Sequence, residues 1–284
     1  MRIGVLGLGI MGRGIVLDLL YNDFIVKAFT RNDNVRAEVK SLDQLARVYS
    51  KTLRSNLTLL VANNFSLVEE VKELAECELI IETISEDVEK KKEVLGFISR
   101  INSKGIIATN TSSISINELA GVIDDPSRFL GLHFMNPPLL SKLVEIISSE
   151  FTSEATVEAV KDFILKLNKD NIEIKDIPGF VINRLLFLLV NQSYDLILNY
   201  KIDPHVIDKA MKKGANYPIG PIKLSENIGI DTCVKILENL FLRTKSNMFK
   251  PSELLLNLLH QSILGKKNNT SVYDAIVSFI KQND

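Results

Sequence analysis

The sequence predicts an α/β protein, in which a doubly wound, mostly parallel sheet is followed by an all-helical C-terminal domain. Up to about Lys175, short apolar runs with the character of strands alternate with segments of helical periodicity. This order is typical of a parallel sheet covered by helices on both faces. After Asp176-Ile177-Pro178-Gly179 only helical patterns follow. We therefore expect two domains, residues 1–178 and residues 179–284.

Each strand and helix of the first domain has a local signal. The expected strands are apolar runs at 2–6, 24–29, 57–62, 79–83, 105–108, 129–134, 143–147 and 171–175. Helices are expected after the first strand, over 34–55, between the fourth and fifth strands and over 153–167. Ser66 with Glu69 and Ser115 with Glu118 have the spacing of a capping box, which satisfies the first amides of a helix. Helices are therefore also expected from Ser66 to Leu74 and from Ser115 onward.

The charge balance argues against nucleic acid or a membrane as a partner. Lys and Arg number 34 and Asp and Glu 35, which gives a formal net charge of -1 and no attraction to polyanions. The most apolar stretch, residues 180–200, contains Asn183, Arg184, Asn191, Gln192 and Asp195. These groups are costly in hydrocarbon, so we expect a buried core helix there and not a membrane span.

The cysteines predict neither a disulfide nor a metal site. Cys77 and Cys233 lie far apart and lack metal-ligand spacing. They fit a reducing cytoplasm, and a first strand that begins at Arg2 leaves no room for a signal peptide. We therefore expect a cytoplasmic protein with no bound metal.

A glycine-rich turn, Gly7-Leu8-Gly9-Ile10-Met11-Gly12, follows the first strand and opens the first helix. In a Rossmann-type domain the first glycine permits the turn, the second lets a pyrophosphate approach, and the third lets helix and strand pack closely. The helix N-terminus then offers its amides to the phosphates. We expect Gly7, Gly9, Ile10, Met11 and Gly12 to bind NAD or NADP. The alternative is a glycine-rich turn that binds nothing.

The end of the second strand bears on the choice of cofactor. NAD binding needs an acidic residue near the adenosine ribose, and the expected position holds Thr30, followed by Arg31. Arg31 can pair with a 2′-phosphate. We therefore expect a preference for NADP. In the alternative, Arg31 is a solvated loop residue and Asp33 contacts the ribose.

A histidine and a glutamate form the candidate catalytic pair. His133 ends an apolar strand, and Glu145 lies within another, Leu143-Val144-Glu145-Ile146-Ile147. A carboxylate among apolar residues needs a partner if it is buried, and the connecting loop could return Glu145 to His133. Such a pair is what alcohol oxidation needs, because the imidazole takes the hydroxyl proton and the carboxylate supports its charge. In the alternative, Glu145 points to solvent.

Two further polar clusters are candidates. Asn110-Thr111-Ser112-Ser113 follows the strand at 105–108, and ligands bind beyond the carboxyl ends of strands in open α/β sheets. Asn183 and Arg184 open the long helix after Pro178. Each cluster has a structural alternative, namely a turn and helix cap for the first and backbone capping for the second.

Several motifs follow one another along nearly the whole chain. They are GLGIMGRG at 7–14, IETISEDVEKKKEV at 81–94, TNTSS at 109–113, HFMNPP at 133–138, LVEII at 143–147, DIPGFVINRLL at 176–186, IDKAMKKGANYPIGPIKL at 207–224 and IGIDT at 228–232. In this order and spacing the chain resembles the L-3-hydroxyacyl-CoA dehydrogenase family, in particular its single-function 3-hydroxybutyryl-CoA dehydrogenases. The resemblance implies an oxidoreductase that interconverts 3-hydroxyacyl-CoA and 3-ketoacyl-CoA, with a helical second domain that forms a homodimer.

The resemblance also implies roles for individual residues. The catalytic pair falls on His133 and Glu145, and the residues that hold the reacting oxygen and the thioester fall on Ser112 and Asn183. Positions that line the cofactor or the substrate fall on Asn136, Glu86, Lys91 and Lys267, and part of the CoA site falls within 34–56. The chain departs from the family at Thr30, where the family has the ribose-binding Asp, at Glu226 and in the tail after Lys267.

Two other functions compete with this one. A dehydrogenase acting on a free acid or sugar acid would need an arginine in the cleft to bind the carboxylate, and Arg184 is the nearby candidate. A nucleotide-binding protein without turnover would lack the catalytic pair, which is present here.

Overall fold

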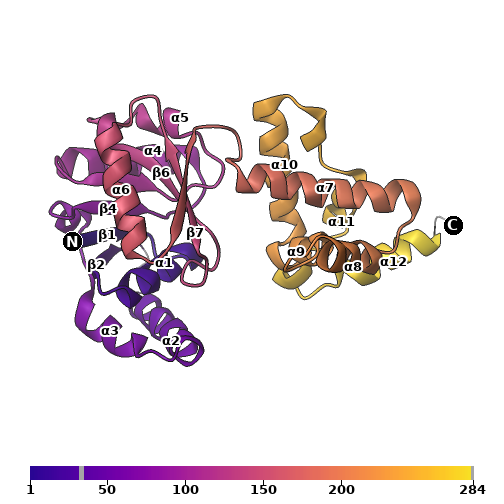
Figure 1. Ribbon diagram of the computed structural model, residues 1–284, viewed down its shortest axis with the longest axis horizontal. Coiled ribbons are helices and arrows are strands. Elements are labelled where there is room, and N and C mark those ends of the chain that lie inside the picture. Colours follow the sequence, from indigo (N-terminus) through magenta and orange to yellow (C-terminus); the bar gives the residue numbers. More distant parts are fainter. Residues whose placement is uncertain (32–34, 283–284) are drawn as a thin grey trace. The chain divides into compact units, whose positions relative to one another are not determined.

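The computed structural model describes residues 1–31 and 35–282. The chain divides into two compact units, Met1–Ile177 and a second that begins at Pro178 (Figure 1). Each unit has its own hydrophobic core. The predicted fold class, a Rossmann-type sheet domain followed by a helical one, is confirmed.

The described part of the first unit contains an eight-stranded sheet in the order β3-β2-β1-β4-β5-β6-β7-β8. Its strands are β1 (Arg2–Leu6), β2 (Ile25–Phe29), β3 (Phe65–Leu67), β4 (Leu79–Glu82), β5 (Ile106–Thr109), β6 (Phe129–Phe134), β7 (Leu143–Ser148) and β8 (Asp170–Lys175). Strands β6 and β7 are antiparallel, whereas β1, β4, β5 and β6 run parallel to one another. The strand order reverses between β1 and β4, which is the ligand-binding position of doubly wound sheets.

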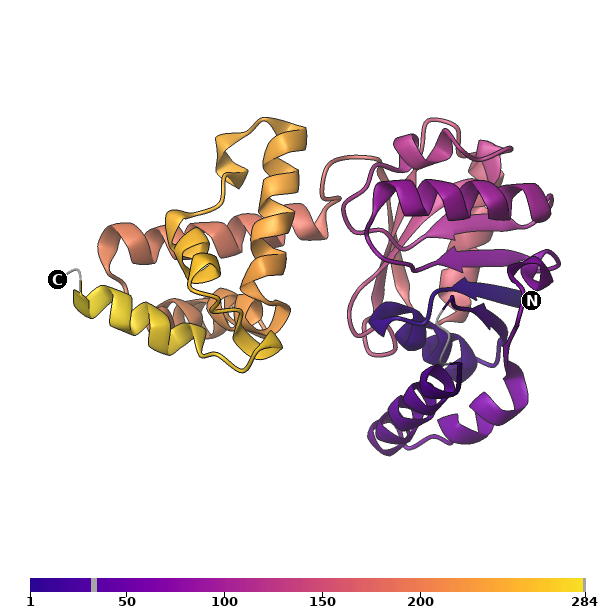
Figure 2. The ribbon, with the colours of Figure 1, turned by 180° about the vertical axis from the view of Figure 1, so that it is seen from behind.

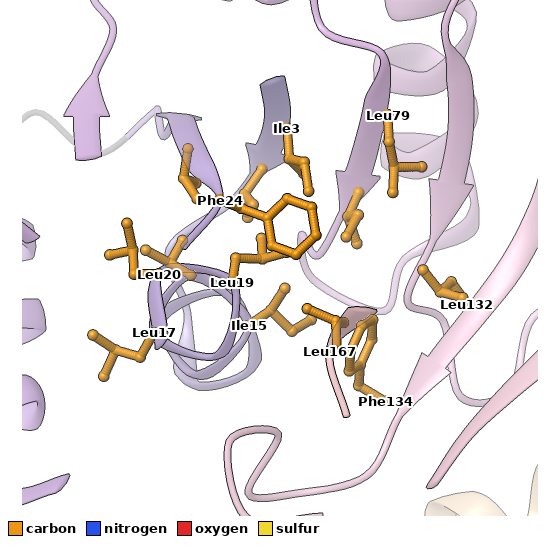
Figure 3. Close-up of a cluster of buried hydrophobic side chains, with 14 of the residues drawn as sticks. Ile3, Ile15, Leu17, Leu19, Leu20, Phe24, Leu79, Leu132, Phe134 and Leu167 are labelled. Carbon is orange, nitrogen blue, oxygen red and sulfur yellow. The ribbon is translucent and has the colours of Figure 1, made fainter. Parts of the chain in front are cut away.

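Helices cover both faces of this sheet. Helices α1 (Ile10–Tyr21) and α6 (Glu154–Lys166) share one hydrophobic cluster with the strands, and Figure 3 shows Ile15, Leu19 and Phe24 within it. Helix α4 (Val88–Ile101) and the short α5 (Ile116–Ala120) connect strands on the other side of the reversal. Right-handed crossovers place such helices on the opposite face, and α6 lies in front of the sheet in Figure 1 and α4 in front of it in Figure 2.

Two local predictions are wrong. Residues 57–62, expected as a strand, belong to helix α3 (Leu57–Asn64), because the Asn56 side chain caps it at Leu59 N and Leu57 and Val61 share its buried face. A short apolar run cannot distinguish a strand from a buried helix by periodicity alone. This helix packs on α2 (Val35–Leu53).

The helix expected from Ser66 to Leu74 is also replaced. Ser66 lies in β3, which pairs in parallel with β2. The capping box is made instead by Glu70 and Glu73, at the 3-10 helix η1 (Val71–Leu74). The predicted box at Ser115 is confirmed for its hydroxyl, which accepts from Glu118 N at 3.2 Å.

The described residues of the second unit form helices and loops. The helices are α7 (Ile182–Tyr200), α8 (Pro204–Gly214), α9 (Pro221–Ile228), α10 (Ile230–Thr244), α11 (Glu253–His260) and α12 (Val272–Gln282), with 3-10 turns η3 (Asn247–Phe249) and η4 (Gly265–Lys267). Phe187, Val190 and Tyr194 of α7 lie in the core, as expected for a core helix. Among the described residues, no helix is long and apolar enough to cross a membrane.

Candidate active site

The loop between β1 and α1 has the geometry of a dinucleotide-binding turn. Gly7 has a φ of 95° and donates its amide to Phe29 O at 2.8 Å. A Cβ at Gly12 would lie 2.0 Å from Gly7 O, so only glycine fits between the helix and the loop. A Cβ at Gly9 would meet nothing within 4 Å, so space at the helix N-terminus is open to a phosphate. The three glycines thus match the roles of turn, approach and close packing.

A cavity of about 570 Å³ lies beside this loop. Its wall includes residues 6–9, Thr30 and Arg31 at the end of β2, and Glu93, Phe97 and Arg100 of α4. The guanidinium carbon of Arg100 lies 6.0 Å from the centre of the Phe97 ring. The volume is typical of a small-molecule site. Asp33, the alternative ribose contact, lies outside the described residues.

His133 and Glu145 are brought together by strand pairing. They are directly opposed in the antiparallel ladder of β6 and β7, and His133 Nδ1 lies 2.7 Å from Glu145 Oε2. Both side chains are buried, with exposed fractions of 7% for His133 and 0% for Glu145. The interpretation in which Glu145 points to solvent is therefore wrong. The pairing explains how a carboxylate is tolerated inside an apolar strand.

Glu86 organises the loop after β5. Its Oε1 accepts the backbone amides of Ser112 at 2.8 Å and Ser113 at 2.9 Å, and also the hydroxyls of Thr111, Ser112 and Ser113. Burial acts to raise the pKa of Glu86, but Lys91, 3.6 Å away, and these hydrogen bonds hold its pKa below the ordinary value. Glu86 is therefore an ionised group at neutral pH, and it fixes the position of Ser112.

A buried ion pair supports this network. Lys91 of α4 is 1% exposed, and its Nζ lies 2.7 and 2.9 Å from the two carboxylate oxygens of Glu82, the last residue of β4. Thr109 of β5 donates to Glu82 Oε2 at 2.6 Å. Glu82 is a supporting residue that no motif marks, although an acidic residue at the end of an apolar run is the same signal that marks Glu145.

These groups lie at the carboxyl ends of the parallel strands β1, β4, β5 and β6. The glycine turn follows β1, the loop with Glu86 follows β4 and the loop with Ser112 follows β5, while His133 lies one residue before the end of β6. Phe134 N donates to Asn110 Oδ1 at 2.9 Å, which links the loop after β5 to the end of β6. Asn136 follows, exposed and joined to Pro137 by a cis peptide bond. The His133–Glu145 pair and the glycine turn thus both lie at the carboxyl ends of the strands, where ligands bind in this fold.

The remaining expected residues lie in the second unit. Asn183 occupies the first turn of α7. Arg184 donates to Pro178 O at 3.3 Å, and its guanidinium carbon lies 5.3 Å from the centre of the Phe249 ring. Lys267 in η4 pairs with Asp231, with Nζ 2.8 Å from Oδ2. Within the described residues, no group of three or more His, Cys, Asp or Glu side chains is placed to hold a metal ion.

Comparison with known families identifies both units. Residues 2–177 match the 3-hydroxyacyl-CoA dehydrogenase NAD binding domain, and residues 179–275 match the 3-hydroxyacyl-CoA dehydrogenase C-terminal domain. The chain belongs to the 3-hydroxyacyl-CoA dehydrogenase family. The match to an NAD binding domain supports a nicotinamide dinucleotide cofactor in either its NAD or its NADP form.

Individual members of the 3-hydroxyacyl-CoA dehydrogenase family resemble the chain along most of its length. A 3-hydroxybutyryl-CoA dehydrogenase from Bradyrhizobium diazoefficiens is 35% identical over 283 residues, covering 96% of this chain and 94% of the relative. A probable 3-hydroxybutyryl-CoA dehydrogenase from Bacillus subtilis is 36% identical over 277 residues, covering 96% of each. The crystal structure of (S)-3-hydroxybutyryl-CoA dehydrogenase from Ralstonia eutropha matches with a TM-score of 0.90 at 31% identity, covering 96% of this chain and 98% of the other. The family and enzyme class expected from the sequence are confirmed.

Proposed function

We propose that this protein is an oxidoreductase that interconverts a 3-hydroxyacyl-CoA and the 3-ketoacyl-CoA. The observation that carries the proposal is the buried His133–Glu145 pair, which lies, like the open glycine turn, at the carboxyl ends of the parallel strands. The names of the relatives, 3-hydroxybutyryl-CoA dehydrogenase, support a short acyl chain such as 3-hydroxybutyryl.

His133 is the group that moves the proton. Its Nδ1 is bonded to Glu145 Oε2, so Nε2 is the nitrogen that takes the proton of the 3-hydroxyl. Glu145 fixes the tautomer and stabilises the imidazolium that forms, and its burial strengthens this interaction. In the reverse direction His133 returns the proton to the ketone oxygen. General acid–base groups of this kind contribute about 10²–10⁴-fold to rate.

Two further residues orient the substrate. Ser112, which Glu86 holds by its amide and hydroxyl, binds the reacting oxygen beside His133. Asn183 at the start of α7 binds the thioester end. These two assignments follow the family resemblance. The position of Ser112 is supported by the rigid loop that carries it.

The first unit fits a nicotinamide dinucleotide. The open N-terminus of α1 at Gly9 suits the pyrophosphate, with Ile10 and Met11 beside it, and the neighbouring cavity suits the adenosine. Glu86, Asn136 and Lys267 complete the cofactor contacts that the resemblance implies, whereas Lys91 is 1% exposed and acts through its ion pairs with Glu82 and Glu86. A bound nicotinamide would supply the hydride acceptor for C3 of the hydroxyacyl group, and the hydride donor for the ketone in the reverse direction.

The form of the cofactor is NADP or NAD, and we favour NADP. Thr30 supplies no carboxylate where NAD enzymes bind the ribose, and Arg31 lines the same cavity. Arg100 lines that cavity as well, so two guanidinium groups are available to a 2′-phosphate. The same wall also contains Glu93, whose carboxylate would repel a 2′-phosphate.

The CoA moiety is assigned to helix α2. Lys40, Arg47 and Lys51 are exposed and are spaced by seven and four residues, which places them on one face of the helix. Such a face attracts the phosphates of CoA. The substrate is thus the partner, and neither nucleic acid nor a membrane is assigned as one.

A homodimer through the helical unit is also proposed. Large apolar side chains of this unit are exposed, among them Leu185 at 63%, Tyr200 at 71% and Leu242 at 59%. Such side chains would lose exposed apolar surface in contact with a second copy of the chain. Light scattering coupled to gel filtration measures the assembly.

A cytoplasmic location agrees with the two free, buried cysteines.

A direct assay tests the activity. The protein is mixed with acetoacetyl-CoA and either NADH or NADPH, and loss of the reduced nicotinamide is followed. Turnover with the thioester and none with free acetoacetate is expected, with a lower KM for NADPH. The converse substrate preference would support the free-acid alternative, which the comparisons do not favour. Absence of turnover with acetoacetyl-CoA would refute the proposed function.

A further inference from the structure

One face of helix α1 is in direct contact with the loop that joins β6 to β7. A Cβ at Gly14 would lie 2.7 Å from Pro138 Cδ, so helix and loop touch with no side chain between them. Asp18 lies four residues further along α1 and therefore on the same face. It is 2% exposed, which is unusual for a carboxylate in an apolar core.

Lys169 completes this contact from the other side. It immediately precedes β8 and is 5% exposed. Its Nζ donates to Pro138 O at 2.8 Å and to Ser141 O at 2.5 Å, and lies 3.2 Å from Asp18 Oδ2. One ammonium group therefore joins the β6–β7 loop to helix α1.

The segments that Lys169 joins are the ones that carry the two halves of the site. The N-terminus of α1 carries the glycine turn, whereas the β6–β7 loop, residues 135–142, begins two residues after His133 and ends three residues before Glu145. A buried ion pair contributes little net stability, because desolvation offsets the attraction. The burial of these two charges is therefore better explained by a role in holding the β6–β7 loop against α1 than by a contribution to stability.

We propose that Lys169 and Asp18 are positioning residues, which hold the His133–Glu145 strands at a fixed place relative to the cofactor-binding helix. The proposal rests on the proposed function. Hydride transfer requires its partners in a near-attack geometry, and a displacement of about 1 Å can lower the rate about 10²-fold. Neither residue touches the reacting groups, so both act through the loop and the helix.

The positioning contact depends on pH. Burial raises the pKa of Asp18 to about 7, although Lys169 and, more weakly, Lys142 at the end of the loop oppose this shift. These two lysines are the charged groups that act on Asp18. As pH rises through neutrality Asp18 gains its charge, and Lys169 then has a full counter-ion on α1. The link between loop and helix is therefore strongest above neutral pH.

Two variants test the proposal. Lys169→Met removes the donor to both loop carbonyls, and Asp18→Asn removes the charge but keeps the shape. Lys161→Met is the matched control, because Lys161 pairs with Glu158 and with Glu173 of β8 at the surface. Acetoacetyl-CoA reduction is measured from pH 6 to 8.5 in each protein. Hydrogen exchange of the Leu140 and Ser141 amides, which bond to Pro137 O, reports on the loop.

Lys169→Met is expected to lower kcat about 10-fold or more, with a smaller change in the KM of the cofactor and faster exchange in the loop. For Asp18→Asn the ratio of wild-type to variant kcat rises about threefold or more between pH 6 and 8. This ratio cancels the contribution of His133, which both proteins share. Lys161→Met behaves as wild type.

Two results would overturn the proposal. One is a Lys169→Met protein with wild-type kcat and wild-type loop exchange. The other, decisive if Lys169→Met does not fold, is an Asp18→Asn protein whose kcat ratio to wild type is constant across this pH range. Absence of turnover in the wild type refutes the proposed function instead, and loop exchange still tests the contact.

Discussion

Replacing Asp18 with Asn should make the stability of the protein less sensitive to pH. Burial raises the pKa of Asp18 from 3.8 to about 7, so between these values the native state binds a proton that the unfolded chain has released. The contribution of this group to stability is therefore fully present below pH 3.8 and is lost as pH rises through 7. Each unit of pKa difference corresponds to about 1.4 kcal/mol, so the wild type loses about 3 kcal/mol relative to the variant between pH 5 and pH 8.

Urea unfolding followed by circular dichroism at pH 5, 6, 7 and 8 measures this difference. The transition of the first unit is the relevant one, because the two units need not unfold together. Asp162→Asn, which removes an exposed carboxylate of α6, controls for the loss of one negative charge. A stability difference between wild type and Asp18→Asn that stays constant from pH 5 to pH 8 would falsify the reasoning.

Three further predictions concern the site. His133→Gln and Glu145→Gln should each lower kcat by about 10²–10⁴-fold while circular dichroism and cofactor binding stay unchanged, and near-normal turnover in either variant would exclude the acid–base assignment. Gly12→Ala should abolish cofactor binding, since its Cβ would lie 2.0 Å from Gly7 O; calorimetric titration showing wild-type affinity would contradict this. Arg31→Ala should raise the KM for NADPH about tenfold and leave that for NADH nearly unchanged, because a charge-assisted contact to a phosphate contributes about 1.5–3 kcal/mol. Equal effects on both cofactors would show that Arg31 does not select between them.

Most of the fold follows from local sequence signals. The strand–turn–helix at Gly7 to Gly12 and the loss of strand patterns after Pro178 predict the architecture, because each has a period and a turn chemistry of its own. The errors fall where the signal is ambiguous. The apolar run after Asn56 fits a strand as well as a helix, and its cap residue was the cue that decides between them. Ser66 and Glu69 have the spacing of a capping box, but Ser66 pairs with β2 and forms part of a strand instead of a helix start.

The catalytic pair of the site can be predicted from the sequence, whereas the buried ion pairs that support it cannot. The approach of His133 to Glu145 follows from two strands joined by a short loop, although the register that aligns them becomes visible only in the structure. The Glu82–Lys91 pair and the Asp18–Lys169 pair join residues distant in sequence or on different elements. Single charged residues in apolar segments mark such positions, but their partners depend on packing that no local pattern encodes.

The ladder between β6 and β7 makes the reactive pair a property of the hairpin itself. The register of the two strands sets the pairing of His133 with Glu145, whereas residues 135–142 set where that pair stands relative to α1. Deleting one amino acid inside a strand would therefore disrupt the pair itself. It turns every later side chain onto the other surface of the sheet and parts the imidazole from its acid in a single step.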